Sequence, residues 1–249
     1  MSIVIPAWNE AAYLPRTLES LRSALPGLGL EVEVLVVDNA STDGTMEVAC
    51  AWGARVVCEP ERRIARARNT GAREASAPWL LFLDADTLVT AEHLAAVRDA
   101  LHDGFVGGGA PVALDASVSR LYTLGLGAWN GLSHRLGLAA GCFLFARAEF
   151  HDAVGGFDER VYAGDELGYS RALRREGSRH GLALRILAIR PVVSSARKVH
   201  WYAPWQHALV LLTFLLFPWA GRFRRLSWFW YRRPAEHSNA SVKRRDDGQ

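Results

Sequence analysis

The stretch LFLDADT, residues 81–87, decides the fold because it joins an apolar run to two carboxylates one residue apart. The apolar part is typical of a strand that is buried on both faces of a sheet. Residues i and i+2 of a strand point to the same face, so Asp84 and Asp86 can converge on one point. Two converging carboxylates favour a cation site, although aspartate is also common in the loop that follows a strand.

The sequence around this stretch predicts a mostly parallel α/β sheet. Over the first hundred residues, short apolar runs alternate with segments of helical periodicity, as in strands linked by helices. The first run is expected to stop at Pro6, because proline removes a backbone donor. Strands are expected at 2–6, 32–38, 54–57 and 79–83, and helices at 11–25, from residue 45, at 62–75 and at 91–101.

Polar segments follow three of these strands directly. They are PAWNE (6–10), DNASTDGT (38–45) and DADT (84–87). Open parallel sheets bind ligands outside the carboxyl ends of their strands, so the three segments predict one shared site.

The second half is less regular. GFVGGGAPV (104–112) indicates an edge strand or a glycine-rich loop, and YAGDELGYSRALRREG (162–177) predicts a helix with an acidic start and a basic end. The sequence has no GxxxxGK[ST] loop, and no GxGxxG follows the first strand.

The composition excludes some classes of protein. Half of the residues are hydrophobic and 22% are charged, which argues against intrinsic disorder. A net charge of +3 without a basic, aromatic-rich face gives no reason to expect a nucleic-acid partner. Three cysteines without CxxC spacing suggest neither a disulfide framework nor a zinc site. Because the N-terminus reads as a strand rather than a signal peptide, a cytoplasmic protein is expected.

Five segments, taken in order and spacing, resemble the family 2 glycosyltransferases of the GT-A fold. They are VIPAWNE (4–10), VLVVDNASTDGT (34–45), ARARNTGAREASAPWLLFLDADT (65–87), GGFDE (155–159) and AGDELGYSRALRREG (163–177). The resemblance implies a GT-A (Rossmann-like), mostly parallel sheet flanked by helices. It also implies metal-dependent, inverting transfer of a sugar from a nucleotide-diphosphate-sugar to an acceptor hydroxyl, with a UDP-sugar favoured and a GDP-sugar as the alternative.

The same resemblance implies a metal site. A diphosphate leaving group needs its charge neutralised, which a divalent ion does as a Lewis acid, and hard carboxylate oxygens suit Mn²⁺ or Mg²⁺. The family pattern makes Asp86 the metal ligand and places Asp84 near the ribose or behind the metal. Arg197, Lys198 and His200 stand near the end of the expected catalytic domain, and basic groups there could hold a phosphate. His200 is expected to complete the metal site, although a surface histidine is the simpler interpretation.

The family pattern also assigns the nucleotide-binding residues. Pro6 and Glu10 follow the first strand, and Glu10 is expected to bind nucleoside hydroxyls. Asp38 is expected to accept a hydrogen bond from the base, and Arg68 to face the diphosphate. Many relatives carry a second acidic residue where this chain has Asn39, which leaves the preferred base open.

The acceptor hydroxyl needs a general base. The resemblance places this base at the start of a helix, in the pair Asp165 and Glu166. Neighbouring helical residues point about 100° apart, so only one of them can face the sugar, and Glu166 is preferred. The alternative is an acidic first turn that only stabilises its helix.

The C-terminal part differs in character. Residues 208–233 are strongly apolar, interrupted by Pro218 and crowded with tryptophan and arginine, which favour the headgroup region of a membrane. Three parts are therefore expected: a catalytic domain (1–202), an amphipathic interfacial helical extension (203–234) and a disordered tail (235–249). Peripheral association with the inner face of the cell membrane, and a glycan or lipid-linked acceptor of the cell envelope, would follow. The alternative is a helix that docks on the domain.

Two rival functions remain. FLDADTLV resembles the opening motif of haloacid-dehalogenase-type phosphatases, with Asp84 as nucleophile and Asp86 as acid, but Leu88 stands where that motif has threonine. A non-catalytic nucleotide-sugar or membrane-surface binding module is the other rival. The missing QxxRW motif argues against repeated chain extension.

Overall fold

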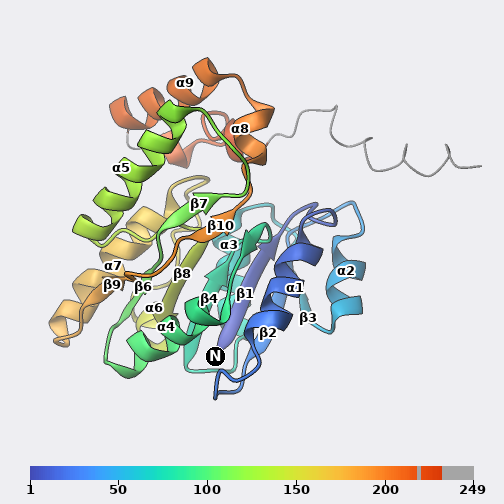
Figure 1. Cartoon of the computed structure of the whole chain (residues 1–249), viewed down its shortest axis with the longest axis vertical. Coiled ribbons are helices and arrows are strands. Elements are labelled where there is room, and N and C mark those ends of the chain that lie inside the picture. Colours follow the sequence, from blue (N-terminus) through green and yellow to red (C-terminus); the bar gives the residue numbers. More distant parts are fainter. Residues whose placement is uncertain (218–219, 232–249) are drawn as a thin grey trace, which may run out of the picture.

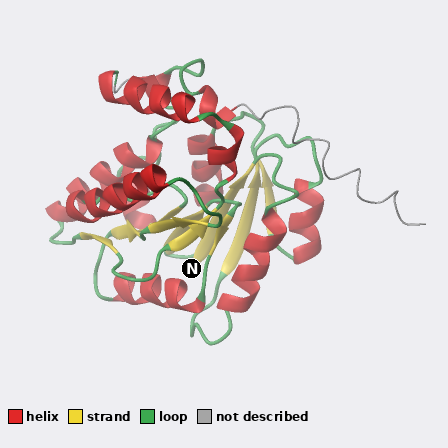
Figure 2. Ribbon diagram, turned by 45° about the horizontal axis from the view of Figure 1, so that its top comes forward, coloured by secondary structure: helices red, strands yellow, loops and turns green. Residues whose placement is uncertain are grey.

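The computed structural model describes residues 1–217 and 220–231. Its centre is a seven-stranded sheet with helices on both faces (Figures 1 and 2). The first elements are β1 (Ser2–Ala7), α1 (Leu14–Ala24), β2 (Glu33–Asp38), α2 (Thr45–Trp52), β3 (Arg55–Cys58), α3 (Ile64–Glu74), β4 (Trp79–Leu83), β5 (Thr87–Leu88) and α4 (Ala91–His102). Then follow β6 (Gly107–Gly109), β7 (Val112–Leu114), α5 (Arg120–Leu136), β8 (Phe143–Arg147), α6 (Ala148–Ala153), α7 (Asp165–Arg179), β9 (Leu184–Ile186), β10 (Val192–Ser194), α8 (Arg197–Trp201), α9 (Pro204–Leu216), η1 (Ala220–Arg222) and α10 (Trp228–Tyr231).

The strand order is β3-β2-β1-β4-β8-β6-β9. The first four strands are parallel, β8 runs antiparallel to β4 and β6, and β6 and β9 are parallel. A second small sheet joins β5, β10 and β7. The predicted mostly parallel α/β sheet is therefore confirmed, and its parallel half brings the ends of β1, β2 and β4 to one edge.

Side chains of the central strands point alternately to the two faces of the sheet, and a hydrophobic core forms on each face. Ile3, Ile5 and Leu81 pack with the apolar sides of α1 and α4, while Val4 and Phe82 pack with α3 and α7 on the opposite face. Both sets are fully buried, as the period of two residues along a strand requires. This double burial fixes the register of the strands, and with it the positions of the polar residues at their ends.

Two local predictions need correction. Pro6 does not stop β1 but lies within it. Its missing N–H is tolerated because the ladder between β1 and β4 covers only Ser2–Val4. The strand Gly107–Gly109 is neither an edge strand nor a loop, since it lies between β8 and β9. A Cβ on Gly108 would come within 1.7 Å of the Arg185 carbonyl oxygen, so only glycine fits there.

The C-terminal elements pack partly on the domain. The backbone N–H of Tyr162 donates to the Gly221 carbonyl at 2.6 Å, and Ala220 and Ser227 are buried. No helix among residues 1–217 and 220–231 is long and apolar enough to cross a membrane. The expected tail at 235–249 and the end of the 203–234 segment lie outside the described residues.

Candidate functional site

A cavity of about 120 Å³ opens at the carboxyl ends of β1 and β4. Its lining brings together residues that lie far apart in the chain, from the loops after β1, β2 and β4, from the start of α3, and from α8 and α10. They are Pro6, Ala7, Trp8, Glu10, Asn39, Arg62, Ile64, Asp84, Ala85, Asp86, Arg197, Lys198, Trp201, Phe229, Trp230 and Tyr231. Four residues predicted from the sequence, Pro6, Glu10, Asp84 and Asp86, therefore meet in one place.

The loops after β1 and β2 hold each other in position. Asn9 adopts a positive φ of 54°, which turns the chain sharply, and its Oδ1 accepts a hydrogen bond from the Thr42 backbone N–H at 2.7 Å. The backbone N–H of Glu10 donates to Thr45 Oγ1 at 2.7 Å. These bonds fix the backbone of Glu10 at the rim of the cavity.

Asp38 and Asn39 have different roles at the end of β2. Asp38 is buried; its Oδ2 accepts from the Ser41 N–H at 3.3 Å, and its Oδ1 has no hydrogen-bond partner in the described part of the chain. The Asn39 amide donates to the carbonyl oxygens of Glu59 and Glu61 at 2.9 and 2.7 Å. A carboxylate could not make these bonds, so the amide at position 39 has a structural reason.

Arg68 joins the end of β4 to the start of α7. Its fully buried guanidinium donates to Asp165 Oδ2 at 2.8 Å, to Asp84 Oδ1 at 3.1 Å and to the Gly141 carbonyl at 2.7 Å. A Cβ on Gly141 would lie 2.9 Å from Arg68 Nη2, so glycine makes room for this contact. Arg68 is not part of the cavity lining; the expected contact with a diphosphate stays a prediction, and the geometry gives it a positioning role.

Arg197, from α8, contacts two carboxylates of the cavity. Its guanidinium donates to both Glu10 oxygens at 2.6 and 2.7 Å, and its Nη2 lies 3.0 Å from Asp86 Oδ2. The side chains of Arg197 and Glu10 are each 9% exposed. Charge-assisted, bidentate pairs of this kind are strong and geometrically specific. Two predicted site residues are therefore held by Arg197, whose pairing with them the sequence did not predict.

The chemistry of Asp84 and Asp86 fits a divalent ion. Burial raises the pKa of Asp84, the Arg68 guanidinium opposes this rise, and the charge of Asp86 adds to it. A cation between the two carboxylates would relieve that repulsion. Within the described ranges, however, no three His, Cys, Asp or Glu side chains form a metal-binding group. His200 is exposed on α8 and does not line the cavity, so its role as a ligand stays a prediction.

The acidic pair begins α7, after Gly164, and its two carboxylates have different environments. Asp165 is buried against Arg68, whereas Glu166 is half-buried and forms no salt bridge within the described residues. Burial, with a contribution from the Asp165 charge, raises the pKa of Glu166 to about 7. A carboxylate with such a pKa is suited to take up a proton near neutral pH. This contrast agrees with the preference for Glu166.

One wall of the cavity is aromatic and was not predicted. The Arg62 guanidinium stacks on the Trp8 ring at 3.1 Å from its centroid and donates to the Tyr231 carbonyl at 2.5 Å. Tyr231 and Phe229, more than 160 residues later in the chain, complete this wall. The only sequence signal for Arg62 was the basic start of the segment 62–75.

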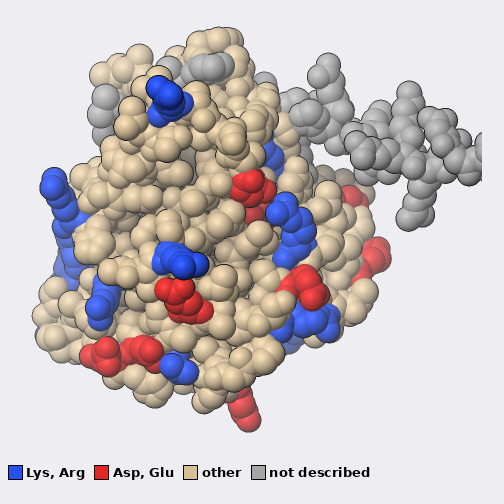
Figure 3. Space-filling model, viewed as in Figure 1, with Lys and Arg blue, Asp and Glu red and all other residues tan. Residues whose placement is uncertain are grey.

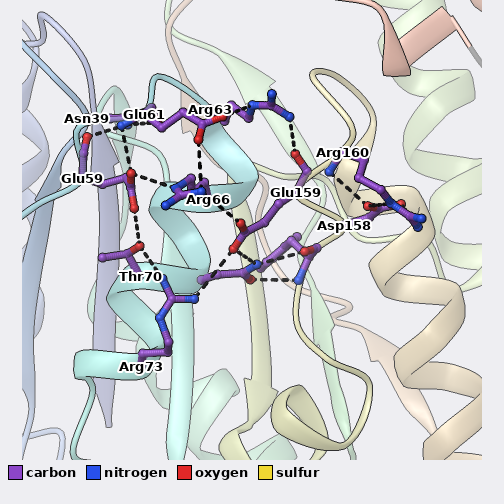
Figure 4. A network of polar contacts seen from close by, with 12 residues as sticks. Asn39, Glu59, Glu61, Arg63, Arg66, Thr70, Arg73, Asp158, Glu159 and Arg160 are labelled. Atoms are coloured by element: carbon purple, nitrogen blue, oxygen red, sulfur yellow. Dashed lines mark hydrogen bonds and ion pairs between the residues drawn. The ribbon is translucent and has the colours of Figure 1, made fainter.

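The remaining arginines of α3 belong to an ion-pair network (Figure 4). Arg66 bonds Glu59 at 2.9 Å and lies 3.0 Å from Glu61, and Thr70 donates to Glu59 at 2.7 Å. The Arg63 guanidinium reaches across to the Glu159 carbonyl at 2.7 Å. These contacts tie α3 to the GGFDE loop and give the arginines a structural role.

Comparison with known proteins gives a family match. A family model described as Glycosyl transferase family 2 matches residues 2–138, which is more than half of the chain. Validoxylamine A glucosyltransferase of Streptomyces hygroscopicus subsp. jinggangensis (strain 5008) is 41% identical over 110 residues. That match covers 42% of this chain and 26% of the relative, so the chain spans about a quarter of the relative's length.

Solved glycosyltransferases share the fold. The mannosyltransferase PcManGT from Pyrobaculum calidifontis, in complex with GDP-Man and Mn²⁺, has a TM-score of 0.63 and 23% identity, covering 90% of this chain and 63% of that one. S. aureus TarS 1-349, in complex with UDP-GlcNAc, has a TM-score of 0.60 and 16% identity, covering 78% and 58%. At such identities the likeness shows the fold alone, and the predicted GT-A fold is confirmed.

Proposed function

Because the chain belongs to glycosyl transferase family 2, we propose that it transfers a sugar from a nucleotide-diphosphate-sugar to an acceptor hydroxyl with inversion. The observation that carries this proposal is the meeting of Glu10, Asp84 and Asp86 with Arg62 and Arg197 in one cavity at the strand ends. This arrangement combines carboxylates for a cation with cationic groups for a diphosphate. Asp84 is bonded to Arg68 and follows the fourth strand, which gives no support to the phosphatase alternative.

The donor is proposed to lie along the ends of β1, β2 and β4. The buried Asp38 Oδ1 lacks a partner among the described residues, which supports its proposed role as the acceptor of a base N–H, although Asp38 does not line the cavity. The neighbouring structures bind UDP-GlcNAc and GDP-Man, so a uridine or a guanine nucleotide is expected. Both bases have ring N–H groups that Asp38 can accept, and UDP remains the favoured nucleotide.

We place a divalent ion, Mn²⁺ or Mg²⁺, at Asp86 with Asp84 close by. When bound, such an ion supplies Lewis-acid neutralisation of the departing diphosphate. The protein contributes the cationic side chains of Arg62, Arg197 and Lys198, which share the cavity with these carboxylates.

Glu166 is proposed as the general base. Its carboxylate takes the proton from the acceptor hydroxyl while the acceptor oxygen bonds to the anomeric carbon and the bond to the diphosphate oxygen breaks. Attack from the face opposite the leaving group inverts the anomeric configuration. Asp165, bonded to Arg68 at 2.8 Å, fixes the first turn of α7.

The acceptor is proposed to reach the site from a membrane surface, as a lipid-linked glycan or a similar molecule. Helix α5 has 17 residues, of which only Ser133 is buried, and it exposes Leu121 and Leu124 at 81% and 72%. Helix α9 contacts it through the rings of Tyr122 and His207, 5.3 Å apart, and exposes Trp205 at 66%. The two helices lie in the upper part of the molecule in Figure 1, and we call their exposed apolar residues the apolar face of α5 and α9.

The charges around this apolar face suit an anionic bilayer. The sequence has no Asp or Glu at 116–148 or 177–231, and exposed Arg222, Arg224 and Arg225 follow α9. In Figure 3 the top of the molecule shows no acidic side chain. Apolar surface combined with basic residues is typical of peripheral membrane binding.

Calorimetric titration with UDP, GDP, CDP and ADP, each with Mn²⁺ and then with EDTA, tests the donor proposal. Metal-dependent binding of one nucleotide in the micromolar range is expected. If none binds under either condition, the transferase proposal fails and the binding-module alternative for nucleotide-sugars fails with it.

A further inference from the structure

Arg197 lies in the cavity that is proposed to bind both the divalent ion and the diphosphate. It reaches the cavity from α8, more than a hundred residues after β4, and binds Glu10 and Asp86 at the same time. Asp86 Oδ2 lies 3.0 Å from Arg197 Nη2, so the carboxylate that would hold a metal ion is already paired with a guanidinium.

The ion pairs of Arg197 are buried and short, but they do not use all of its hydrogen-bond donors. The Nε atom of Arg197 is buried without a hydrogen-bond partner in the described part of the chain. A buried donor without an acceptor is costly, and it marks a place where a ligand atom would be stabilising. The guanidinium lies beside the rings of Tyr13 and Trp201, at 4.4 and 5.4 Å from their centroids, so aromatic faces can support the cation as it shifts.

We propose that Arg197 is a placeholder cation, which neutralises Glu10 and Asp86 before the donor binds and transfers to the donor diphosphate when a divalent ion takes Asp86. The inference rests on the proposed function, because it needs a diphosphate donor. A diphosphate oxygen offers the Arg197 guanidinium an anionic partner in place of Asp86.

The physical reason is competition for one carboxylate. Arg197 Nη2, 3.0 Å from Asp86 Oδ2, and a divalent ion on the same carboxylate repel each other. A metal ion that arrives alone must therefore displace the guanidinium from this ion pair. A metal ion that arrives with the diphosphate gives Arg197 a new partner at the same time, so metal and nucleotide bind cooperatively.

The test is Mn²⁺ binding to the nucleotide-free full chain, measured by calorimetry or by electron paramagnetic resonance of free Mn²⁺. In Arg197→Gln, Mn²⁺ alone should bind about tenfold or more tighter than in the wild type, because the ion pair between Arg197 and Asp86 no longer opposes it. The same variant should bind the UDP–Mn²⁺ or GDP–Mn²⁺ complex more weakly than the wild type. For the binding of Mn²⁺ alone, Lys198→Gln is the matched control, because it removes one positive charge from the same helix and cavity and keeps the ion pair between Arg197 and Asp86.

Arg197→Lys covers the case in which the glutamine variant unfolds on a thermal scan. Its single ammonium cannot hold Glu10 bidentately and Asp86 together, so an intermediate affinity for Mn²⁺ alone is expected. The inference is overturned if the Arg197 variants bind Mn²⁺ no tighter than both the wild type and Lys198→Gln do. It is also overturned if the nucleotide binds with the same affinity in Mn²⁺ and in EDTA. A wild type that binds no nucleotide at all would instead defeat the proposed function.

Discussion

At the scale of single residues, the two carboxylates at the start of α7 differ because only one of them has a cationic partner. Asp165 is buried and bonded to Arg68, whereas burial and the Asp165 charge raise the pKa of Glu166 to about 7. Neighbouring residues on a helix face different directions, so one can hold the fold while the other meets the acceptor. The sequence alone predicted the pair. The two roles differ because Asp165 is bonded to Arg68, which lies 97 residues earlier in the chain.

Glu166→Gln should abolish sugar transfer and leave nucleotide binding unchanged, because an amide cannot accept the proton of the acceptor. In the wild type, kcat/KM should rise about tenfold per pH unit below pH 7 and level off above it, as the carboxylate deprotonates. Stopped assays from pH 5 to 9 would measure this. A profile that is flat across pH 7, or a glutamine variant with normal turnover, would exclude Glu166 as the base.

Stability should also depend on Glu166. Its pKa is raised above the reference value of 4.5, so the folded protein favours the protonated acid, and the stabilisation present below pH 4.5 is lost as the pH rises to about 7. Glu166→Gln should therefore be more stable than wild type at pH 8, by up to about 3 kcal/mol, and equal to it near pH 4. Urea unfolding at both pH values measures the difference.

Asp165→Asn is the contrasting variant. It leaves the buried Arg68 charge without its closest carboxylate, so a loss of about 3 kcal/mol is expected at pH 8. If both variants change stability in the same direction at pH 8, the assignment of different environments to the two carboxylates is wrong.

At the scale of elements, Asn69 of α3 holds the GGFDE loop that leads into α7. Its side-chain amide donates to the Phe157 carbonyl at 2.9 Å and accepts from the Phe157 N–H at 2.8 Å, like a short piece of backbone pairing. Gly156 makes this possible, because a Cβ there would lie 2.5 Å from Asn69 Oδ1. The position of α7, and with it that of Glu166, depends on this contact.

Gly156→Ala should therefore destabilise the fold by more than Gly155→Ala. Both glycines have positive φ, 70° and 77°, so each alanine costs about 1 kcal/mol in backbone strain. Only Gly156 faces the Asn69 side chain, whereas Gly155 faces open space. Thermal unfolding of the two variants compares them directly, and equal losses of stability would show that the Asn69 contact does not hold the loop.

The sequence predicted the elements better than it predicted their partners. Residues 79–83 and the polar ends of three strands could be identified because strand periodicity and turn chemistry are local. The place of Gly107–Gly109 inside the sheet could not, because the close approach of β9 exists only in three dimensions. Arg197 was named as a basic group for a phosphate, but its pairing with Glu10 and Asp86 was not predicted, because these contacts join residues more than a hundred positions apart in the chain.

At the scale of the whole molecule, the apolar face of α5 and α9 lies apart from the charged surface around the sheet (Figures 1 and 3). The sequence predicted an interfacial segment at 203–234 but did not predict that α5 would join it. The docked-helix alternative describes η1 and the region around Ser227, while the outer side of α9 stays exposed at Leu209 and Leu212. The docked-helix alternative therefore describes part of the C-terminal region, and the interfacial segment stays a prediction.

The double variant Leu121→Asn with Leu124→Asn should bind anionic vesicles about tenfold more weakly, since each leucine loses apolar area that would be buried in the bilayer. Co-sedimentation with phosphatidylcholine vesicles containing phosphatidylserine would measure this, and binding should fall as salt is raised. Met46→Asn, an equally polar change at a 38% exposed residue of α2, is the control. Unchanged vesicle binding in the double variant would remove α5 from the proposed membrane surface.

The most direct test of the donor site compares nucleotide binding in wild type and Asp86→Ala, with Mn²⁺ and with EDTA. Asp99→Ala, at an exposed position of α4, serves as the control. In the wild type and the control, UDP or GDP should bind with Mn²⁺ and lose most of its affinity in EDTA, whereas Asp86→Ala should bind equally weakly under both conditions. Metal-dependent binding of normal strength in Asp86→Ala would contradict the assignment of this cavity as the site of donor and metal.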